Sequence, residues 1–162
     1  MILITLSACG EEKPHPKTVA EKLLDLHPHL PFVQVIYHSD ALPGQKAYMS
    51  DRLRSLLYDE GRERELPEFA RVEEYAVCLS GGIYGMEIHI FRMKSRSDAR
   101  NMEAILWRRA RLMKRRSLYL YRPEAYETYL CTAQVYTVGK YVLLLSTGEN
   151  GKILSRLKSM IG

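Results

Sequence analysis

Glu87, His89 and Arg109 are the residues whose types and spacing come closest to a reactive site. Glu87 and His89 are two positions apart, so on a β-strand both side chains point to the same face. An acid is disfavoured in the middle of a strand, and a bidentate contact with an arginine on a crossing helix would be strong and directional. We favour a structural ion pair between Glu87 and Arg109, with His89 as a hydrogen-bonding neighbour. A ligand pocket or an enzyme site built from the three residues is the alternative.

The remaining histidines form no pattern typical of catalysis. His27 and His29 flank Pro28, and His38 precedes a serine and an aspartate, from which a metal site or a Ser/His/Asp arrangement could be assembled. The chain contains no HExxH, GxSxG or glycine-rich phosphate-loop motif. It also has no Cys/His spacing typical of zinc. We therefore expect no metal, no cofactor and no enzymatic activity.

A strongly basic segment runs from Arg92 to Arg116. It contains ten lysines and arginines against Asp98 and Glu103, a net charge of +8, whereas the whole chain carries +5. Such asymmetry indicates an anionic partner, and a solvated helix face is the alternative. The cations that we expect to bind the partner are Arg108, Arg111, Lys114, Arg115 and Arg116.

Nucleic acid is a second interpretation of the same basic helix, residues 96–116. Trp107, Tyr119 and Tyr121 lie in or near it and could stack on bases. No helix-turn-helix, zinc or RNP-like pattern accompanies them. We therefore expect no nucleic-acid binding, which would require a cytosolic protein and would weaken steeply with salt.

The N-terminal sequence Leu6-Ser7-Ala8-Cys9 is typical of the end of a bacterial lipoprotein signal peptide. Small residues precede the cleaved bond there, and the cysteine carries the lipid. Only eight residues precede Cys9 and none is basic, so the front of the signal is shortened relative to a typical one. A short buried strand, with Cys9 as a small apolar residue, is the alternative. We expect a lipid-anchored protein on the extracytoplasmic face of the cell membrane.

The chain divides into three parts in this interpretation: a truncated signal and lipobox (1–9), a polar tether with two prolines (10–17) and one globular domain (18–162). Its hydrophobic fraction of 46% and charged fraction of 27% are ordinary for a globular protein. Cys78 and Cys131 lie in apolar, strand-like stretches. We favour two buried free thiols over one disulfide.

Hydrophobic periodicity predicts an α+β fold, a two-layer sandwich with a mostly antiparallel four-stranded sheet. Two hairpins supply the strands, and one long helix and several short helices cover one face. The expected strands are 74–80, 84–94, 131–138 and 141–147, with 30–38 left uncertain by Pro31. The expected helices are 18–26, capped by Thr18, 47–58, with Leu53, Leu56 and Leu57 inward, a long helix capped by Ser97, and 153–160.

Residues from about 70 to 160 resemble the bacterial lipoprotein family catalogued as domain of unknown function 4358. The residues that carry the likeness are Tyr75-Ala76-Val77, Gly81 or Gly82, Glu87-Ile88, Phe91, Asp98-Ala99, Arg109, Tyr121, Pro123, Glu124 and Gly139-Lys140-Tyr141-Val142-Leu143-Leu144. The long helix of this chain has more arginines than the family pattern. The resemblance implies an exported, lipid-anchored protein of Gram-positive type and no particular reaction. Its partners would then be anionic lipids, wall polymers or an envelope protein.

Overall fold

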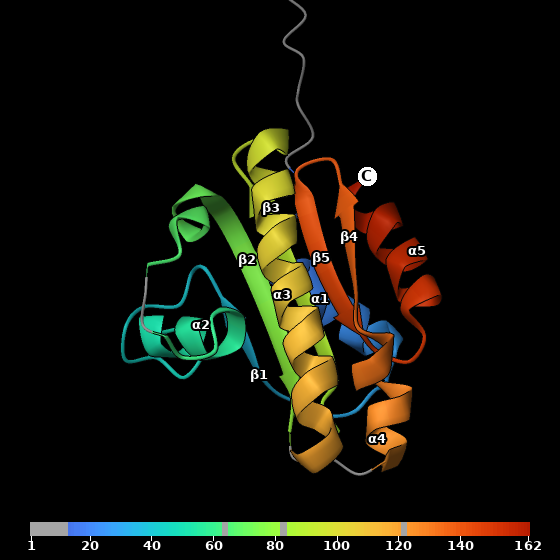
Figure 1. The fold of residues 1–162 in the computed structure, drawn as a ribbon. Coiled ribbons are helices and arrows are strands. Elements are labelled where there is room, and N and C mark those ends of the chain that lie inside the picture. The colour runs from blue at the N-terminus through green and yellow to red at the C-terminus, as the bar shows by residue number, and fades with distance from the viewer. Residues whose placement is uncertain (1–12, 63–64, 82–83, 121–122) are drawn as a thin grey trace, which may run out of the picture.

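A five-stranded antiparallel sheet forms the centre of the domain (Figure 1). The computed structural model describes residues 13–62, 65–81, 84–120 and 123–162, with backbone only for 116–120. The strands are β1 (Val33–His38), β2 (Val72–Ser80), β3 (Glu87–Met93), β4 (Gln134–Val138) and β5 (Tyr141–Ser146), in the order β1-β2-β3-β5-β4. The α+β class and both hairpins are confirmed, but the expected number of four strands is wrong.

The fifth strand is β1, which lies at the edge of the sheet beside β2. Its pairing with β2 is irregular between Val33 and Val35. Most of its residues are half-buried rather than alternately buried and exposed. An edge strand tolerates a preceding proline, so Pro31 was a weaker argument against this strand than the sequence analysis assumed.

Helices cover both faces of the sheet, so the domain has three layers rather than two (Figure 1). The helices are α1 (Pro16–Leu26), α2 (Asp51–Tyr58), α3 (Arg96–Leu120), α4 (Pro123–Thr128) and α5 (Asn150–Ile161), with 3₁₀ turns η1 (Pro67–Arg71) and η2 (Leu130–Thr132). The reason is visible in β5, whose six residues are all buried. A continuous apolar run of this kind needs cover on both sides.

The two covered faces hold separate apolar clusters. On the face covered by α2 and α3, called the α3 face below, Phe91 and Leu144 pack against Met102 and Leu106. On the face covered by α1 and α5, called the α1/α5 face, the core residues are Leu23, Ile88, Ile90, Leu143, Ile153 and Leu157. Alternate residues of β3 therefore belong to different cores, as strand geometry requires.

Three helices, α1, α3 and α5, begin earlier than expected from the sequence, and α2 begins later. The Nδ1 atom of His15 accepts a hydrogen bond from the Lys17 N–H at 3.1 Å, and Pro16 occupies the first turn of α1, so Thr18 is not the cap. In α3, Ser95 rather than Ser97 accepts from the Asp98 N–H, at 3.0 Å. Ser50 caps α2.

The N-terminal tether is shorter than expected. Residues 16 and 17 belong to α1, and the Nζ atom of Lys13 donates to the backbone oxygens of Ile161 and Gly162, at 3.2 Å each. Cys9 and the rest of residues 1–12 lie outside the described residues. Leu56, expected to point inward, is 46% exposed.

Cys78 and Cys131 are both free, but only Cys78 is buried. Burial raises the pKa of the Cys78 thiol to about 12. Cys131 is exposed in η2, where its Sγ atom donates to the Glu127 carbonyl at 2.7 Å, so its expected place in a buried strand is wrong. Among the described residues, no helix combines the length and the apolar character needed to cross a bilayer.

Candidate functional site

A hydrogen-bonded ion pair joins β3 to α3. Glu87, the first residue of β3, is 6% exposed. The Nε atom of Arg109 donates to its Oε2 atom at 3.0 Å, and the Nη2 atom donates to Oε1. The contact is therefore bidentate, the geometry in which arginine and carboxylate bind each other best. The structure thus brings Glu87 and Arg109 together where the sequence analysis placed them.

His89 extends this pair to α2. It is fully buried, with its Nε2 atom 2.9 Å from Glu87 Oε2 and its Nδ1 atom 2.8 Å from the Tyr58 hydroxyl. An ionised carboxylate only accepts hydrogen bonds, so Nε2 carries the proton and donates to Glu87. Nδ1 then accepts from the tyrosine O–H, which fixes the tautomer of a neutral histidine.

The electrostatics of the network follow from burial and from Arg109. Burial by itself would raise the pKa of Glu87, but the guanidinium of Arg109 and the hydrogen bond from His89 outweigh it and lower the pKa to about 2. Burial lowers the pKa of His89 below its ordinary value of 6.5. At neutral pH the network therefore holds one carboxylate, one guanidinium and a neutral imidazole.

A second arginine of α3 contacts the end of α2. The Nη1 atom of Arg108 donates to Asp59 Oδ1 at 3.1 Å, and Asp59 is only 1% exposed. Arg109 also lies 3.5 Å, through Nη1, from the carbonyl of Leu57. Two consecutive arginines thus contact two different elements: Arg109 pairs with Glu87 of β3, and Arg108 pairs with Asp59 at the end of α2.

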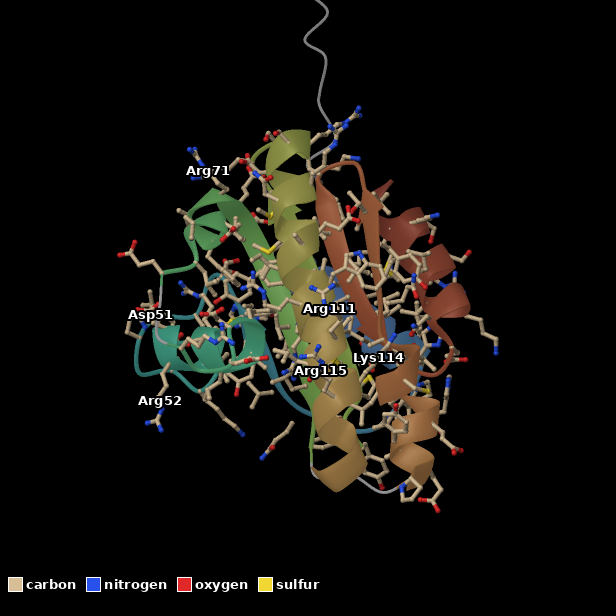
Figure 2. The ribbon with its side chains drawn as sticks, viewed as in Figure 1. Asp51, Arg52, Arg71, Arg111, Lys114 and Arg115 are labelled. Carbon is tan, nitrogen blue, oxygen red and sulfur yellow. The ribbon has the colours of Figure 1, made fainter. Side chains whose placement is uncertain are left out.

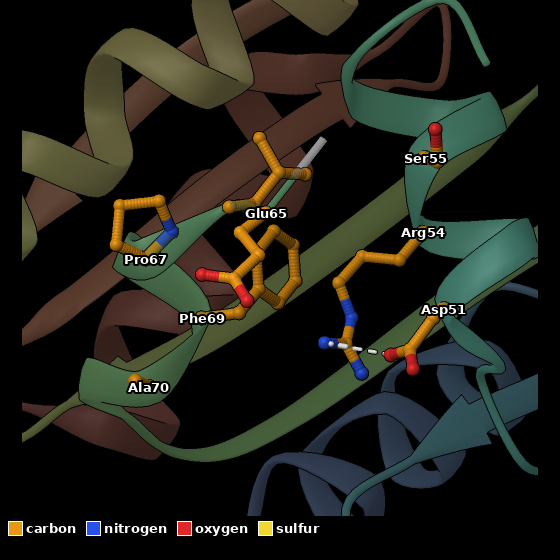
Figure 3. Close-up of a pocket in the computed structure, with 8 residues that line it drawn as sticks. Asp51, Arg54, Ser55, Glu65, Pro67, Phe69 and Ala70 are labelled. Atoms are coloured by element: carbon orange, nitrogen blue, oxygen red, sulfur yellow. Dashed lines mark ion pairs between the residues drawn. The ribbon is translucent and has the colours of Figure 1, made fainter. Parts of the chain in front are cut away.

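Aromatic rings separate the network from the nearest pocket. A pocket of about 530 Å³ lies between α2 and η1, where Arg54 stacks 4.9 Å from the Phe69 ring centre and contacts Asp51 at 3.2 Å (Figure 3). Phe69 in turn packs on Tyr58 with ring centres 5.2 Å apart. The Tyr58 hydroxyl and His89 thus lie behind this aromatic layer.

The order Tyr58–His89–Glu87 has the logic of a nucleophile, a base and an orienting acid. Tyr58 is fully buried, however, and burial raises its pKa well above 10. The hydroxyl is therefore a buried hydrogen-bond donor in this arrangement. The geometry instead suits a rigid link that holds α2 and α3 on the sheet, because every donor and acceptor named above is satisfied.

Sequence reasoning missed Tyr58 and Asp59. Tyr58 and His89 are 31 positions apart, and no local spacing connects the end of α2 with β3. The only available signal was the pair of polar groups that follows the apolar Leu56-Leu57 at the end of a predicted helix. That signal indicates a helix end and names no partner.

Three cations of the basic segment that are exposed or half-buried lie close together on the outer surface of α3. Arg111 and Arg115 are exposed and Lys114 is half-buried, and all three project from the middle of the helix (Figure 2). Their i, i+3 and i+4 spacing places them on one face. We call this group the α3 patch. Of the other expected anion-binding residues, Arg108 turns to Asp59, and the side chain of Arg116 lies outside the described residues.

The other histidines lie at two places. The Nε2 atom of His15 is 3.2 Å from Asp40 and 3.8 Å from Glu74, and His38 is 4.0 Å from Asp40. His27 and His29 come together with an acid that the sequence analysis did not consider, Glu149. Ser39, His15 and Asp40 do meet, but the serine hydroxyl and the carboxylate both lie at the Nε2 atom of His15, while Nδ1 caps α1, so these described contacts do not form a Ser/His/Asp relay.

No protein-family model matches this chain, and comparisons with curated proteins and with solved structures find no match either. The resemblance to the lipoprotein family therefore stays a prediction.

Proposed function

We propose that this chain is a non-catalytic binding module, fastened to the outer face of a bacterial membrane through a lipidated Cys9, whose α3 patch binds phosphate-rich anions. Such anions are present in lipid headgroups and in wall polymers. The observation that carries the proposal is the α3 patch: Arg111 and Arg115 are exposed, Lys114 is half-buried, and the three cations lie on one face of the helix.

The lipobox motif and the position of Lys13 together support the anchor. A diacylated Cys9 would supply the two chains that stable anchoring needs. Four residue steps separate Cys9 from Lys13, a reach of at most about 14 Å. The carbonyl of Lys13 accepts from Arg92 Nη1 at 3.1 Å, close to where β3 leads into α3. The N-terminal end of α3 would therefore lie nearest the membrane.

The α3 patch lies away from that end. At 1.5 Å per residue, Arg111 is about 22 Å further along α3 than Arg96. A domain standing on its anchor would present the patch to polymers above the membrane. A domain that tilts onto α3 would present it to anionic headgroups. Both sources offer the same chemistry, which lysine and arginine bind through charge-assisted hydrogen bonds.

Binding of the full chain carrying Cys9→Ser, which removes the anchor, tests the α3 patch. The probes are inorganic polyphosphate, phosphatidylglycerol vesicles and phosphatidylcholine vesicles at low salt. We expect binding to one or both anionic probes and none to phosphatidylcholine. Near an anionic surface each cation contributes about 1 kcal/mol, so the triple variant Arg111→Gln, Lys114→Gln and Arg115→Gln should bind up to about a hundredfold more weakly.

A matched control removes the same charge elsewhere. Lys46, Arg52 and Lys158 are exposed and lie on other elements, so their triple substitution to glutamine should weaken binding less. Equal losses in the two triple variants would reject a specific patch. Equal binding to neutral and anionic probes would reject an anionic partner.

The anchor has its own test. Mass spectrometry of the native chain from membranes should find a diacylated Cys9 as the first residue. A chain recovered from the cytosol with residues 1–8 attached and an unmodified thiol would contradict the lipid anchor, whatever the α3 patch binds.

A further inference from the structure

Three potential metal ligands from distant parts of the chain meet beside the α1/α5 face. They are His27, which ends α1, His29, and Glu149, which precedes α5. One ligand atom from each residue lies within 4.8 Å of the other two. This is the one group of three or more such ligands in the described part of the chain.

The distance between the ligand atoms of His27 and Glu149 suits a tetrahedral ion. His27 Nδ1 is 3.4 Å from Glu149 Oε1, and His29 Nε2 contacts the same oxygen. Ligand atoms bound at about 2.1 Å from a tetrahedral zinc lie about 3.4 Å apart. His27 and Glu149 are therefore already spaced as two corners of such a site. His29 is 61% exposed and can move outward to become the third.

The backbone around the cluster is fixed independently of any ion. The N–H of His27 donates to the Leu24 carbonyl at 3.1 Å, and its own carbonyl accepts from Leu30 at 3.0 Å. On the other side, the Asn150 side chain donates to the carbonyls of Thr132 and Leu145, at 2.7 and 3.1 Å, which holds the start of α5 against the sheet.

Gly148 fixes the residue before Glu149. It has a φ of +76°, and a Cβ there would approach the carbonyl oxygen of Thr128 to 3.0 Å. The Nζ atom of Lys152 donates to Glu149 Oε2 at 3.2 Å. This leaves Oε1 directed at the two histidines, which is how outer-shell partners orient a metal-binding carboxylate.

We propose that His27, His29 and Glu149 bind one divalent transition-metal ion, with zinc as the best fit. Two imidazoles and one carboxylate suit zinc, iron, nickel or copper, whereas magnesium and calcium prefer oxygen ligands alone. Three protein ligands leave the fourth tetrahedral position open to water or to an anion. His27 also lines a surface hollow together with Lys152, Ser155 and Arg156, and the two cations there favour an anion.

No metal was expected because only the two histidines are close together in the sequence. Glu149 follows His29 by 120 positions, and the site exists only because α1 and α5 pack side by side. The site is independent of the α3 patch and of the anchor, so each can fail without the other.

Titration of the full chain with zinc, with binding measured by isothermal calorimetry, tests the site. We expect one zinc per chain and no response to magnesium. Glu149→Gln and His27→Gln should each weaken zinc binding by more than about a hundredfold, because losing a ligand costs more than losing an outer-shell partner. Cobalt in place of zinc should give the visible absorption of a tetrahedral complex. Thermal unfolding without metal shows whether each variant remains folded.

Two control variants distinguish zinc binding at this site from non-specific zinc binding elsewhere on the chain. His15→Asn changes the other histidine–carboxylate group while keeping a side chain that can cap α1, and Cys131→Ser removes the exposed thiol. Both should bind zinc like the unchanged chain. The proposal is overturned if zinc does not bind saturably, if Glu149→Gln binds as tightly as the unchanged chain, or if either control abolishes binding.

Discussion

Different interactions hold the helices on the two faces of the sheet, although alternate residues of the same strand, β3, contribute to both faces. On the α1/α5 face, β3 contributes Ile88 and Ile90 to a cluster of aliphatic side chains. On the α3 face it contributes Glu87 and His89, which are buried and hydrogen-bonded, beside Phe91. One face is an apolar contact, and the other contains a polar network within its apolar core.

The difference between the two faces indicates which helix must be positioned accurately on the sheet. Apolar burial is roughly proportional to area and has no direction, so it holds α1 and α5 without fixing each atom. A bidentate ion pair works in one geometry only. We infer that the pair of Glu87 and Arg109 fixes the position of the 25-residue helix α3, and thereby the direction in which the α3 patch faces.

The largest effect is expected from Arg109→Met. It leaves the carboxylate of Glu87 buried without its cation, which typically costs about 3–5 kcal/mol. Urea unfolding at neutral pH measures the loss. Arg111→Met, two positions along the same helix but exposed, is the matched control and should change stability by less than about 0.5 kcal/mol. A loss below about 1 kcal/mol for Arg109→Met would contradict the claim that the ion pair holds α3 on the sheet.

The apolar face should tolerate a change of shape but not a void. Leu157 is fully buried there, so Leu157→Ala should cost about 3 kcal/mol through lost burial and the cavity left behind. Leu157→Met keeps most of the volume and should cost less than about 1.5 kcal/mol. Similar losses for the two variants, measured by urea unfolding, would mean that this face is also geometrically strict.

Tyr58→Phe tests the far end of the network. It removes the donor to His89 Nδ1, which stays buried and loses its only named partner. An unsatisfied buried group costs about 1–3 kcal/mol, and the phenyl ring keeps the contacts with Phe69 and Phe91. Thermal unfolding compared with Tyr84→Phe, at a tyrosine that is 50% exposed, separates this loss from a general effect of removing a hydroxyl. Equal shifts in the two variants would argue against a stabilising hydrogen bond between Tyr58 and His89.

The smallest expected effect is a dependence on pH. Unfolded His89 takes up a proton below its ordinary pKa of 6.5, whereas burial lowers the pKa of the folded residue. The unfolded chain then binds more protons, so stability falls as the pH drops through 6.5. Glu87 adds a further loss between its ordinary pKa of 4.5 and about 2. In His89→Phe, the free energy of unfolding should depend less on pH near 6.5. An unchanged slope there would contradict the lowered pKa of His89.

Local patterns predicted what is local in this fold. The alternation in β3 placed Glu87 and His89 on one face, and hydrophobic periodicity predicted the long helix α3, since both depend on neighbouring residues alone. The pair with Arg109 was favoured because the helix that carries this arginine was expected to cross the strand that carries Glu87.

Contacts made by tertiary packing could not be predicted in this way. The links from Tyr58 to His89 and from Asp59 to Arg108 depend on where α2 docks, and the meeting of His29 with Glu149 depends on α1 packing beside α5. The cover on the second face could have been inferred from the continuous apolar run of β5, which the sequence analysis treated only as half of a hairpin.

A double-mutant cycle on Glu87 and Arg109 tests the central inference most directly. The free energy of unfolding is measured for Glu87→Gln, for Arg109→Met and for the double variant. The account predicts that the double variant loses less than the sum of the single losses, by about 1–3 kcal/mol, because each partner alone leaves the other buried and unpaired. Additive losses, with a coupling near zero, would contradict the view that this pair fixes α3 on the sheet.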